Sequence, residues 1–175
     1  MKEKIEKIIE IPEGVEIKVD SKISVKGPKG EIERRFSYPN ISIEISGNKL
    51  LIVSEKGTKR EKKIIMTTAA HIKNMINGVK EGFKYRLQVC SVHFPITVKI
   101  EGDFLKVKNF FGETKERKAL ILPGVKAEIK GDIIEVESID REKAGQTAAN
   151  IETATKIRSR DRRIFQDGIY IIEKA

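Results

Sequence analysis

The residues best suited to chemistry form a dense arginine cluster late in the chain. The stretch from Lys156 to Gly168 reads KIRSRDRRIFQDG, and its first eight residues carry five cations against one carboxylate, a local charge of +4. The cations are Lys156, Arg158, Arg160, Arg162 and Arg163. Because a planar guanidinium grips phosphate oxygens bidentately and stacks on bases, this cluster predicts contact with a polyanion.

The surroundings of the cluster support a nucleic-acid surface. Only three arginines occur through Gly82, whereas seven follow it, so the second half is the better candidate. The segment before the cluster is rich in polar side chains that bond phosphate, sugar or base edges, with small alanines between them that permit close approach. The predicted binding residues are Arg141, Lys143, Gln146, Asn150, Lys156, Arg158, Arg160, Arg162, Arg163 and Gln166.

A second basic stretch, KGTKREKK from Lys56 to Lys63, precedes a predicted helix. Two interpretations stay open for it. It is a charged loop with a helix cap, or it is a secondary polyanion contact made by Lys56, Lys59, Lys62 and Lys63.

The composition limits the partners. The 175 residues carry a net charge of +9, with 39% hydrophobic and 35% charged residues, which is typical of a folded basic protein that binds nucleic acid or an anionic membrane. Cys90 is the single cysteine, so an intrachain disulfide and a cysteine-rich zinc site are excluded. The opening residues do not resemble a signal peptide, and a cytoplasmic location is the expectation.

Other motifs do not predict catalysis. His71 and His93 lie on different predicted elements without a nucleophile or ligand set at an informative spacing, which favours structural histidines. The glycines lie in hairpin turns, not in a phosphate-binding loop. The G-x-x-G of Gly27 to Gly30 resembles the backbone clamp of KH domains, but it joins two predicted strands, and a hairpin turn is the favoured interpretation. We predict no catalytic residue, no metal site and no cofactor.

An internal repeat organises the elements that position the cluster. Val25–Glu31 aligns with Val107–Glu113, each as a strand, a turn closed by glycine and a second strand. Gly47-Asn48 and Gly131-Asp132 are two-residue hairpin signals between alternating apolar runs. Each copy of the repeat therefore contains two predicted hairpins.

A predicted helix follows the second hairpin of each copy. The apolar or small residues recur at helical spacing in two stripes, Ile65, Ala69, Ile72, Ile76 and Val79 in the first and Ala144, Ala148, Ile151 and Thr155 in the second. Gln146 and Asn150 lie four apart, so we expect both on the exposed face.

The predicted fold class is α+β, with two tandem repeated domains, each a small antiparallel sheet with one packed helix. Residues 1–82 form the first, structural domain, and residues 83–175 form the second domain, which we expect to be the main nucleic-acid-binding one. We expect a strand from Phe83 to Phe94 to open the second domain. A turn at Asp167-Gly168 then returns the chain, so that Ile169 to Ile172 join the sheet.

Several motifs resemble one family closely. They are VKGPKGE (25–31), HIKNMINGVKEGFKYRL (71–87), AGQTAANIE (144–152) and RDRRIFQDGIY (160–170). Together they resemble the large-subunit ribosomal proteins numbered six in bacteria and nine in eukaryotes, in their archaeal form. The resemblance covers nearly the whole chain.

The resemblance implies a structural, non-enzymatic protein that binds 23S-type ribosomal RNA near the sarcin-ricin loop and the stalk base. Its partners would be that RNA, neighbouring large-subunit proteins and, in passing, translation factors, with no membrane and no DNA. Family RNA contacts map onto the Gln146 to Asn150 helix and the Arg158 to Gly168 segment. The expected location is cytoplasmic and ribosome-bound.

Three other classes of function fit less well. A free single-strand binder needs aromatic platforms, and Phe110-Phe111 is the one paired exposed candidate for such a platform. An enzyme needs a converging acid, base, nucleophile or metal set. A peripheral membrane protein needs an amphipathic helix with bulky apolar anchors.

Overall fold

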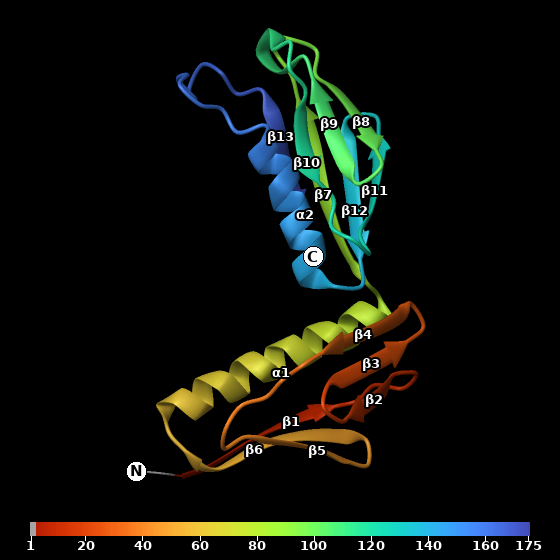
Figure 1. Cartoon of the computed structure of the whole chain (residues 1–175), viewed down its shortest axis with the longest axis vertical. Helices are drawn as coiled ribbons and strands as arrows, with labels where there is room; N and C mark the ends of the chain where they lie inside the picture. The colour runs from red at the N-terminus through yellow and green to blue at the C-terminus, as the bar shows by residue number, and fades with distance from the viewer. Residues whose placement is uncertain (1–2) are drawn as a thin grey trace. The chain divides into compact units, whose positions relative to one another are not determined.

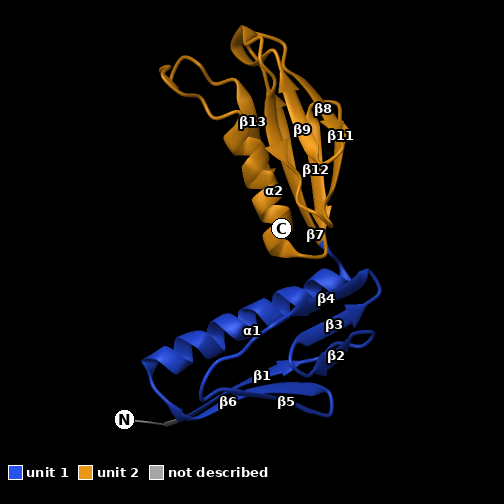
Figure 2. Ribbon diagram, viewed as in Figure 1, with its two compact units in different colours: residues 1–82 blue, residues 83–175 orange. Residues whose placement is uncertain are grey.

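The computed structural model describes residues 3–175, and the chain separates between Gly82 and Phe83 into two units, residues 1–82 and 83–175 (Figure 2). The division falls at the end of the first copy of the repeat. Antiparallel strands and a long helix make up each unit (Figure 1). The predicted α+β class with two tandem repeated units is confirmed, with the refinement that the strands of each unit are divided between two small sheets.

The first unit combines helix α1 (Lys59–Lys80) with two three-stranded sheets, paired in the orders β1-β6-β5 and β2-β3-β4. Its strands are β1 (Glu3–Glu10), β2 (Glu16–Val19), β3 (Ile23–Gly27), β4 (Gly30–Arg34), β5 (Ser42–Ser46) and β6 (Lys49–Gly57).

The second unit combines helix α2 (Arg141–Ala154) with sheets in the orders β10-β9-β8 and β11-β12-β7-β13. Its strands are β7 (Phe83–Cys90), β8 (Thr97–Glu101), β9 (Phe104–Lys108), β10 (Arg117–Leu120), β11 (Lys126–Lys130), β12 (Ile133–Ser138) and β13 (Gly168–Glu173). A short 3₁₀ turn, η1 (Phe110–Gly112), lies between β9 and β10.

The two units share a plan with one difference. Strands β1, β6 and β5 correspond to β7, β12 and β11, whereas β13 has no counterpart among the strands described for residues 3–82. Strand β7 ends at Cys90, so the predicted continuation to Phe94 is wrong. The backbone N–H groups of Val92 and His93 donate to the carboxylate of Asp167 instead of to a neighbouring strand.

Each helix buries the predicted stripe against its own sheets. Ile65, Ile72 and Val79 of α1 are fully buried with Val25, Leu50 and Ile52 of the first unit. In the second unit, the small Ala144 and Ala148 and the larger Ile151 of α2 pack into a core with Leu87 and Ile134. Alanine on the buried face lets α2 lie close to the strands beneath it.

The hairpin turns follow the glycine signals. Gly47 and Gly131 have φ of 60° and 61°, the left-handed conformation that two-residue hairpins require. Gly27 pairs with Gly30 across the β3–β4 turn, so the hairpin interpretation of this G-x-x-G is confirmed. A Cβ on Gly27 would lie 2.8 Å from Cγ2 of Val79, and the N–H of Lys29 donates to the Val79 carbonyl at 3.0 Å. This turn therefore closes directly on the end of α1.

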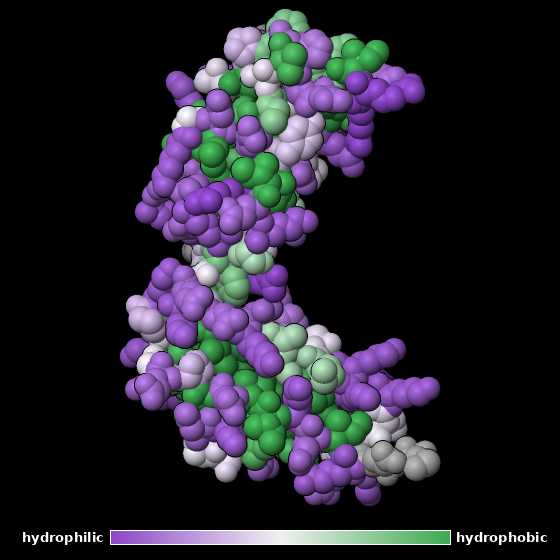
Figure 3. All heavy atoms as spheres, turned by 180° about the vertical axis from the view of Figure 1, so that it is seen from behind, coloured by the Kyte–Doolittle hydropathy of each residue, from purple (hydrophilic) through white to green (hydrophobic). Residues whose placement is uncertain are grey.

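The surface of each unit is mainly hydrophilic, with small apolar patches visible on the face in Figure 3. Exposed apolar side chains include Ile8 and Ile45 in the first unit and Val92 and Ile164 in the second.

Candidate nucleic-acid interface

The predicted arginine cluster forms an irregular segment between α2 and β13, residues 156–167, here called the arginine loop (Figure 1). All five of its cations, Lys156, Arg158, Arg160, Arg162 and Arg163, are exposed. The loop begins at the carboxyl end of α2, where the helix dipole favours positive charge. It therefore presents all five cations to solvent from the connection between α2 and β13.

Asp161 organises the tip of the loop. Its carbonyl accepts the N–H of Phe165 at 2.9 Å, and its carboxylate accepts both the backbone N–H and the side chain of Arg163, at 2.9 and 2.8 Å. The Arg163 guanidinium thereby holds the pKa of the Asp161 carboxyl below its usual range. The turn of the chain lies at residues 162–164, so the predicted turn at Asp167-Gly168 is wrong.

Asp167 is instead a buried anchor at the base of the loop, only 1% exposed. It accepts the backbone N–H groups of Val92 and His93 at 3.0 and 2.9 Å, and its Oδ1 lies 2.8 Å from Nδ1 of His93. Burial alone would raise the pKa of this carboxyl, but the hydrogen bonds from His93 and the backbone outweigh it and the pKa is lowered. His93 has the structural role that its sequence context predicts.

Arg160 is stacked on two aromatic rings. Its guanidinium carbon lies 4.9 Å from the ring centre of Phe111 and 5.0 Å from that of Phe165. The two rings meet edge to face with centres 5.6 Å apart. Cation–π stacking fixes the plane of the guanidinium and leaves its N–H groups free to meet an anion.

Phe110 and Phe111 do not form the exposed pair that the sequence suggests. Phe110 is 1% exposed and belongs to the core of the second unit, while Phe111 is half-buried beneath Arg160. Phe111 also has φ of 50°, as Asn109 has φ of 58°, so two non-glycine residues adopt left-handed backbone beside the arginine loop. Such strain persists where the surroundings over-determine the conformation.

Arg117 connects this region to α2, a role that sequence reasoning missed. Its Nη1 donates to the carbonyls of Ala154 and Lys156 at 3.0 and 3.3 Å. Glu113 holds the same guanidinium at 2.6 and 2.8 Å, and the Phe110 ring centre lies 4.2 Å from it. This side chain therefore satisfies the carbonyl of the last residue of α2 and one carbonyl of the arginine loop, which fixes where the loop starts.

The predicted polar face of α2 is present but less open than expected. Lys143 and Gln146 are exposed, whereas Asn150 is half-buried because its Nδ2 donates to the Leu120 carbonyl at 3.0 Å. Gln146 donates in turn to Oδ1 of Asn150 at 2.9 Å. The expectation that both amides are freely exposed is therefore wrong for Asn150.

Two other predicted residues lie at opposite ends of the site. Arg141, at the start of α2, donates to the Ala175 carbonyl at 2.8 Å, while Gln166 is exposed near the base of the arginine loop. A helix of 14 residues spans roughly 20 Å, so Arg141 and the loop belong to one elongated surface and not to one cluster.

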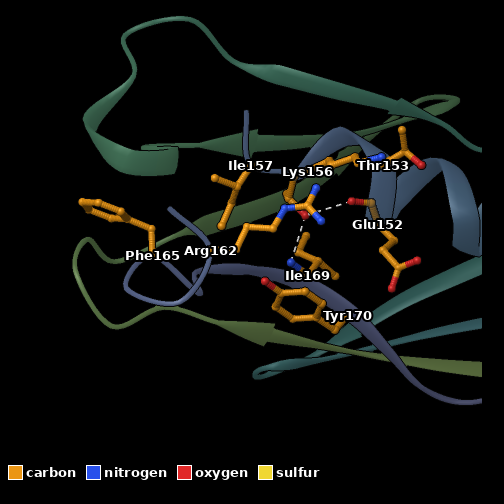
Figure 4. A pocket seen from close by; sticks show the side chains of 9 residues that line it. Glu152, Thr153, Lys156, Ile157, Arg162, Phe165, Ile169 and Tyr170 are labelled. Carbon is orange, nitrogen blue, oxygen red and sulfur yellow. Dashed lines mark hydrogen bonds between the residues drawn. The ribbon is translucent and has the colours of Figure 1, made fainter. Parts of the chain in front are cut away.

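A pocket opens between the end of α2, the arginine loop and β13 (Figure 4). Its volume is about 280 Å³, and Arg162 and Lys156 border it together with Glu152, Thr153 and Tyr170. Glu152 and Tyr170 lie 18 residues apart in the chain and border one pocket only after folding, so no local pattern indicates a role for either.

The secondary basic stretch lies in the first unit. Lys56 lies near the end of β6, while Lys59, Lys62 and Lys63 are on the first turns of α1. All four side chains are exposed. Thr58 and Glu61 form a capping box, in which the Glu61 carboxylate accepts the Thr58 N–H at 2.8 Å. The predicted helix cap is confirmed, and the polyanion contact stays a prediction.

Neither metal binding nor membrane crossing has support in the part of the chain that the structure describes. Residues 3–175 contain no group of three or more histidine, cysteine or acidic side chains placed to hold a metal ion. Over the same residues, no helix has the length and apolar character needed to cross a membrane.

Comparisons with known proteins agree with this architecture. The family described as ribosomal protein L6 matches residues 11–82 and 94–168, once in each unit. The chain is 46% identical over 167 residues to large ribosomal subunit protein uL6 of Methanobrevibacter smithii, which covers 95% of this chain and 94% of the relative. Proteins of the same name from Aeropyrum pernix (48% over 168 residues; 95% and 92% covered) and Methanosarcina mazei (47% over 176 residues; both fully covered) are similarly close.

Proposed function

The chain belongs to the ribosomal protein L6 family as an archaeal-type member, and from that premise we propose that it binds 23S-type ribosomal RNA through its second unit. It is a structural, non-enzymatic component of the large ribosomal subunit. The proposed location on the subunit is near the factor-binding region, at the sarcin-ricin loop and the stalk base. There it would contact neighbouring large-subunit proteins and, in passing, translation factors of the cytoplasm.

The exposed arginine loop carries this proposal. Arg158, Arg160 and Arg162 project from a segment whose base is fixed by Asp167 and whose start is fixed by Arg117. Arginine forks bind phosphate oxygens bidentately, and guanidinium planes stack on unpaired bases. Arg160, stacked on two rings, and Arg163, bonded to Asp161, lose little conformational freedom when RNA binds, which supports the loop as the main source of affinity.

Net charge alone does not favour the second unit. Residues 1–82 contain 17 Lys and Arg against 12 Asp and Glu, a balance of +5, while residues 83–175 contain 18 against 14, a balance of +4. The proposal therefore rests on how the charges are held and on arginine replacing lysine. The proposal predicts that RNA affinity depends more on where the cations lie than on how many each unit carries.

A pair of quadruple variants tests this proposal. Arg158, Arg160, Arg162 and Arg163 are changed to glutamine in one protein, and Lys56, Lys59, Lys62 and Lys63 in the other, which removes the same charge. Binding to 23S-type ribosomal RNA is measured by filter retention at several salt concentrations. Each lost phosphate contact reduces the slope of log K against log salt by about 0.7–0.9, so the arginine variant is expected to lose up to about three units.

The lysine variant is expected to lose much less affinity and slope. Equal losses in the two variants would contradict the assignment of the RNA site to the second unit. Retention of the wild-type protein on large subunits after a high-salt wash separates a ribosomal component from a free RNA binder, which is expected to wash off.

A further inference from the structure

The pocket beside the arginine loop has the size and shape of a site for one small ring system. Its volume of about 280 Å³ lies just below the roughly 300–1,000 Å³ of pockets that hold drug-sized ligands. It is bordered by the last turn of α2, the loop and β13, and Figure 4 shows Arg162 reaching over it from the loop, with Tyr170 on the opposite side.

Hydrogen bonds from α2 to β13 make the inner wall rigid. Thr155 Oγ1 accepts the N–H of Ile169 at 2.9 Å and donates to the Glu152 carbonyl at 3.3 Å (Figure 4). Oε1 of Glu152 accepts the N–H of Ile171 at 3.2 Å. A wall already held in place needs little ordering when a ligand enters, which favours binding.

Tyr170 supplies a ring in a fixed position. Its hydroxyl donates to the Gln166 carbonyl at 2.9 Å, and a Cβ on Gly168 would lie 3.2 Å from its Cζ, so glycine makes room for the ring. Burial raises the pKa of this hydroxyl, yet 40% of the residue stays exposed. Unstacked bases bind to aromatic side chains in this way, and every base has a face that can stack.

The charges around the pocket match a nucleotide. Lys156 and Arg162 place two exposed cations at its border, where a backbone phosphate would sit. The Glu152 carboxylate is half-buried and uses Oε1 for Ile171, which leaves Oε2 to accept a hydrogen bond from a base amino group. Two cations and one carboxylate among the residues that border the pocket suit a nucleotide, which offers a phosphate to the cations and a base amino group to the carboxylate.

We propose that this pocket takes one unstacked nucleotide of the bound RNA, with its base on the Tyr170 ring and its phosphate on Arg162 and Lys156. This inference rests on the proposed function of RNA binding. It adds a single-nucleotide subsite to a surface otherwise made of phosphate contacts.

The test compares Tyr170→Leu with the matched control Tyr170→Phe in the full chain, with 23S-type ribosomal RNA as the probe. Tyr170→Leu removes the ring and is expected to weaken binding by about tenfold, as loss of one base–aromatic stack does, without changing the salt slope. Tyr170→Phe removes only the hydroxyl that holds Gln166 and is expected to stay within about threefold of wild type. Far-UV circular dichroism on heating checks that both variants are folded.

Thr153→Leu narrows the pocket from an exposed helix position, so it does not depend on how Tyr170→Leu folds. It is expected to weaken RNA binding to a similar degree. Ultraviolet crosslinking of the wild-type protein to the RNA, followed by mass spectrometry, is expected to find a nucleotide attached to the peptide that contains Tyr170.

Wild-type affinity in both Tyr170→Leu and Thr153→Leu would overturn the inference, as would equal losses in Tyr170→Leu and Tyr170→Phe, which indicate a loop-anchoring role. In either case the quadruple arginine variant still reports on the proposed function, because only Arg162 of its four arginines borders the pocket and the other three would still account for most of the loss of salt slope. Absence of RNA binding by the wild-type chain would reject both proposals.

Discussion

The connection between the third and fourth strands of each unit is used differently in the two units. In the first, the tight β3–β4 turn packs on the end of α1, with Gly27 against Val79 and Lys29 bonded to the Val79 carbonyl. In the second, the β9–β10 connection is longer and contains η1, and Arg117 takes over the contact with the helix end. The same connection thus packs directly on the helix in the first unit, whereas in the second unit only the side chain of Arg117 reaches the helix end.

The difference explains why arginine gathers in the second unit. The longer connection brings Phe110 into the core and Phe111 beneath Arg160, so it supports a loop that has no counterpart in residues 3–82. A duplicated unit thus acquired a distinct surface through one loop and one added strand, while its core plan stayed the same.

Replacing Phe110 with alanine is expected to produce the largest difference in stability between the two units. Phe110 is 1% exposed, and truncating a buried phenylalanine costs about 3–5 kcal/mol of unfolding free energy. Because Arg117 stacks on this ring, the arginine loop should loosen with the core. Hydrogen exchange of the full chain, read peptide by peptide, is expected to increase in residues 83–175 and to change little in residues 3–82.

Phe104→Ala is the matched control, because Phe104 lies on β9 and is 42% exposed, whereas Phe110 is in the core. If Phe110→Ala destabilised the second unit and left exchange in the arginine loop unchanged, the longer connection would not be what orders the loop.

Gly27→Ala tests the contact between the β3–β4 turn and α1 in the first unit. The expected loss of stability is smaller than for Phe110→Ala. The new methyl group would lie 2.8 Å from Cγ2 and 2.9 Å from the carbonyl oxygen of Val79, and such overpacking costs about 1–3 kcal/mol. Exchange should rise at the last turn of α1 and in the β3–β4 turn.

Gly112→Ala provides the contrast in the second unit. Its Cβ would have no atom closer than 3.8 Å, but φ is 74°, so the cost comes from the backbone alone. Little change in exchange is expected at the end of α2. A rise there as large as the rise at the end of α1 in Gly27→Ala would show that the β9–β10 connection also packs directly on its helix, and would contradict the proposed difference between the units.

The smallest expected effect concerns acid stability, which depends on Glu135 in the second unit. Its carboxylate contacts Lys130 at 2.5 Å, Lys84 at 2.9 Å and Arg86 at 3.2 Å, and the hydrogen bonds from Lys130 and Lys84 lower its pKa to about 2. Since the folded pKa lies below the ordinary value of 4.5, the stabilisation is complete above about pH 4.5 and is lost as the pH falls toward 2.

Glu135→Gln is therefore expected to flatten the decrease in melting temperature between pH 4.5 and 2, measured by circular dichroism. Glu137→Gln is the control, because Glu137 is largely exposed and contacts Lys84 at 3.1 Å. Identical dependence of the melting temperature on pH in wild type and Glu135→Gln would show that Glu135 does not contribute to the loss of stability in acid.

Local patterns predicted the parts of the fold that depend on neighbouring residues. The helical stripes and the hairpins at Gly47-Asn48 and Gly131-Asp132 were predicted correctly, because spacing and turn chemistry act over a few residues. The exposure of the arginine loop also followed from its charge density. The assignment of RNA binding to these residues remains a prediction.

The contacts that were missed join residues far apart in the chain. Asp167 meets Val92 across 75 residues, and Arg117 meets Ala154 across 37, so no local pattern indicates either contact. Phe110 and Phe111 are adjacent and of the same type, yet one is in the core and the other is partly exposed. Their difference depends on the left-handed backbone at Phe111, which residue type alone does not indicate.

Glu152 of α2 and its C-cap residue Thr155, which bond β13, also protect this edge of the sheet against pairing with another copy. Ile169 and Ile171 point their N–H groups away from β7, along the outer edge of the sheet, and Thr155 and Glu152 occupy them. An edge whose donors are already satisfied cannot easily recruit a strand from another copy. The opposite edge, β11, presents Lys126 and Lys130, whose charge discourages the same pairing. Both edges of this sheet are therefore protected against pairing with a strand of another copy.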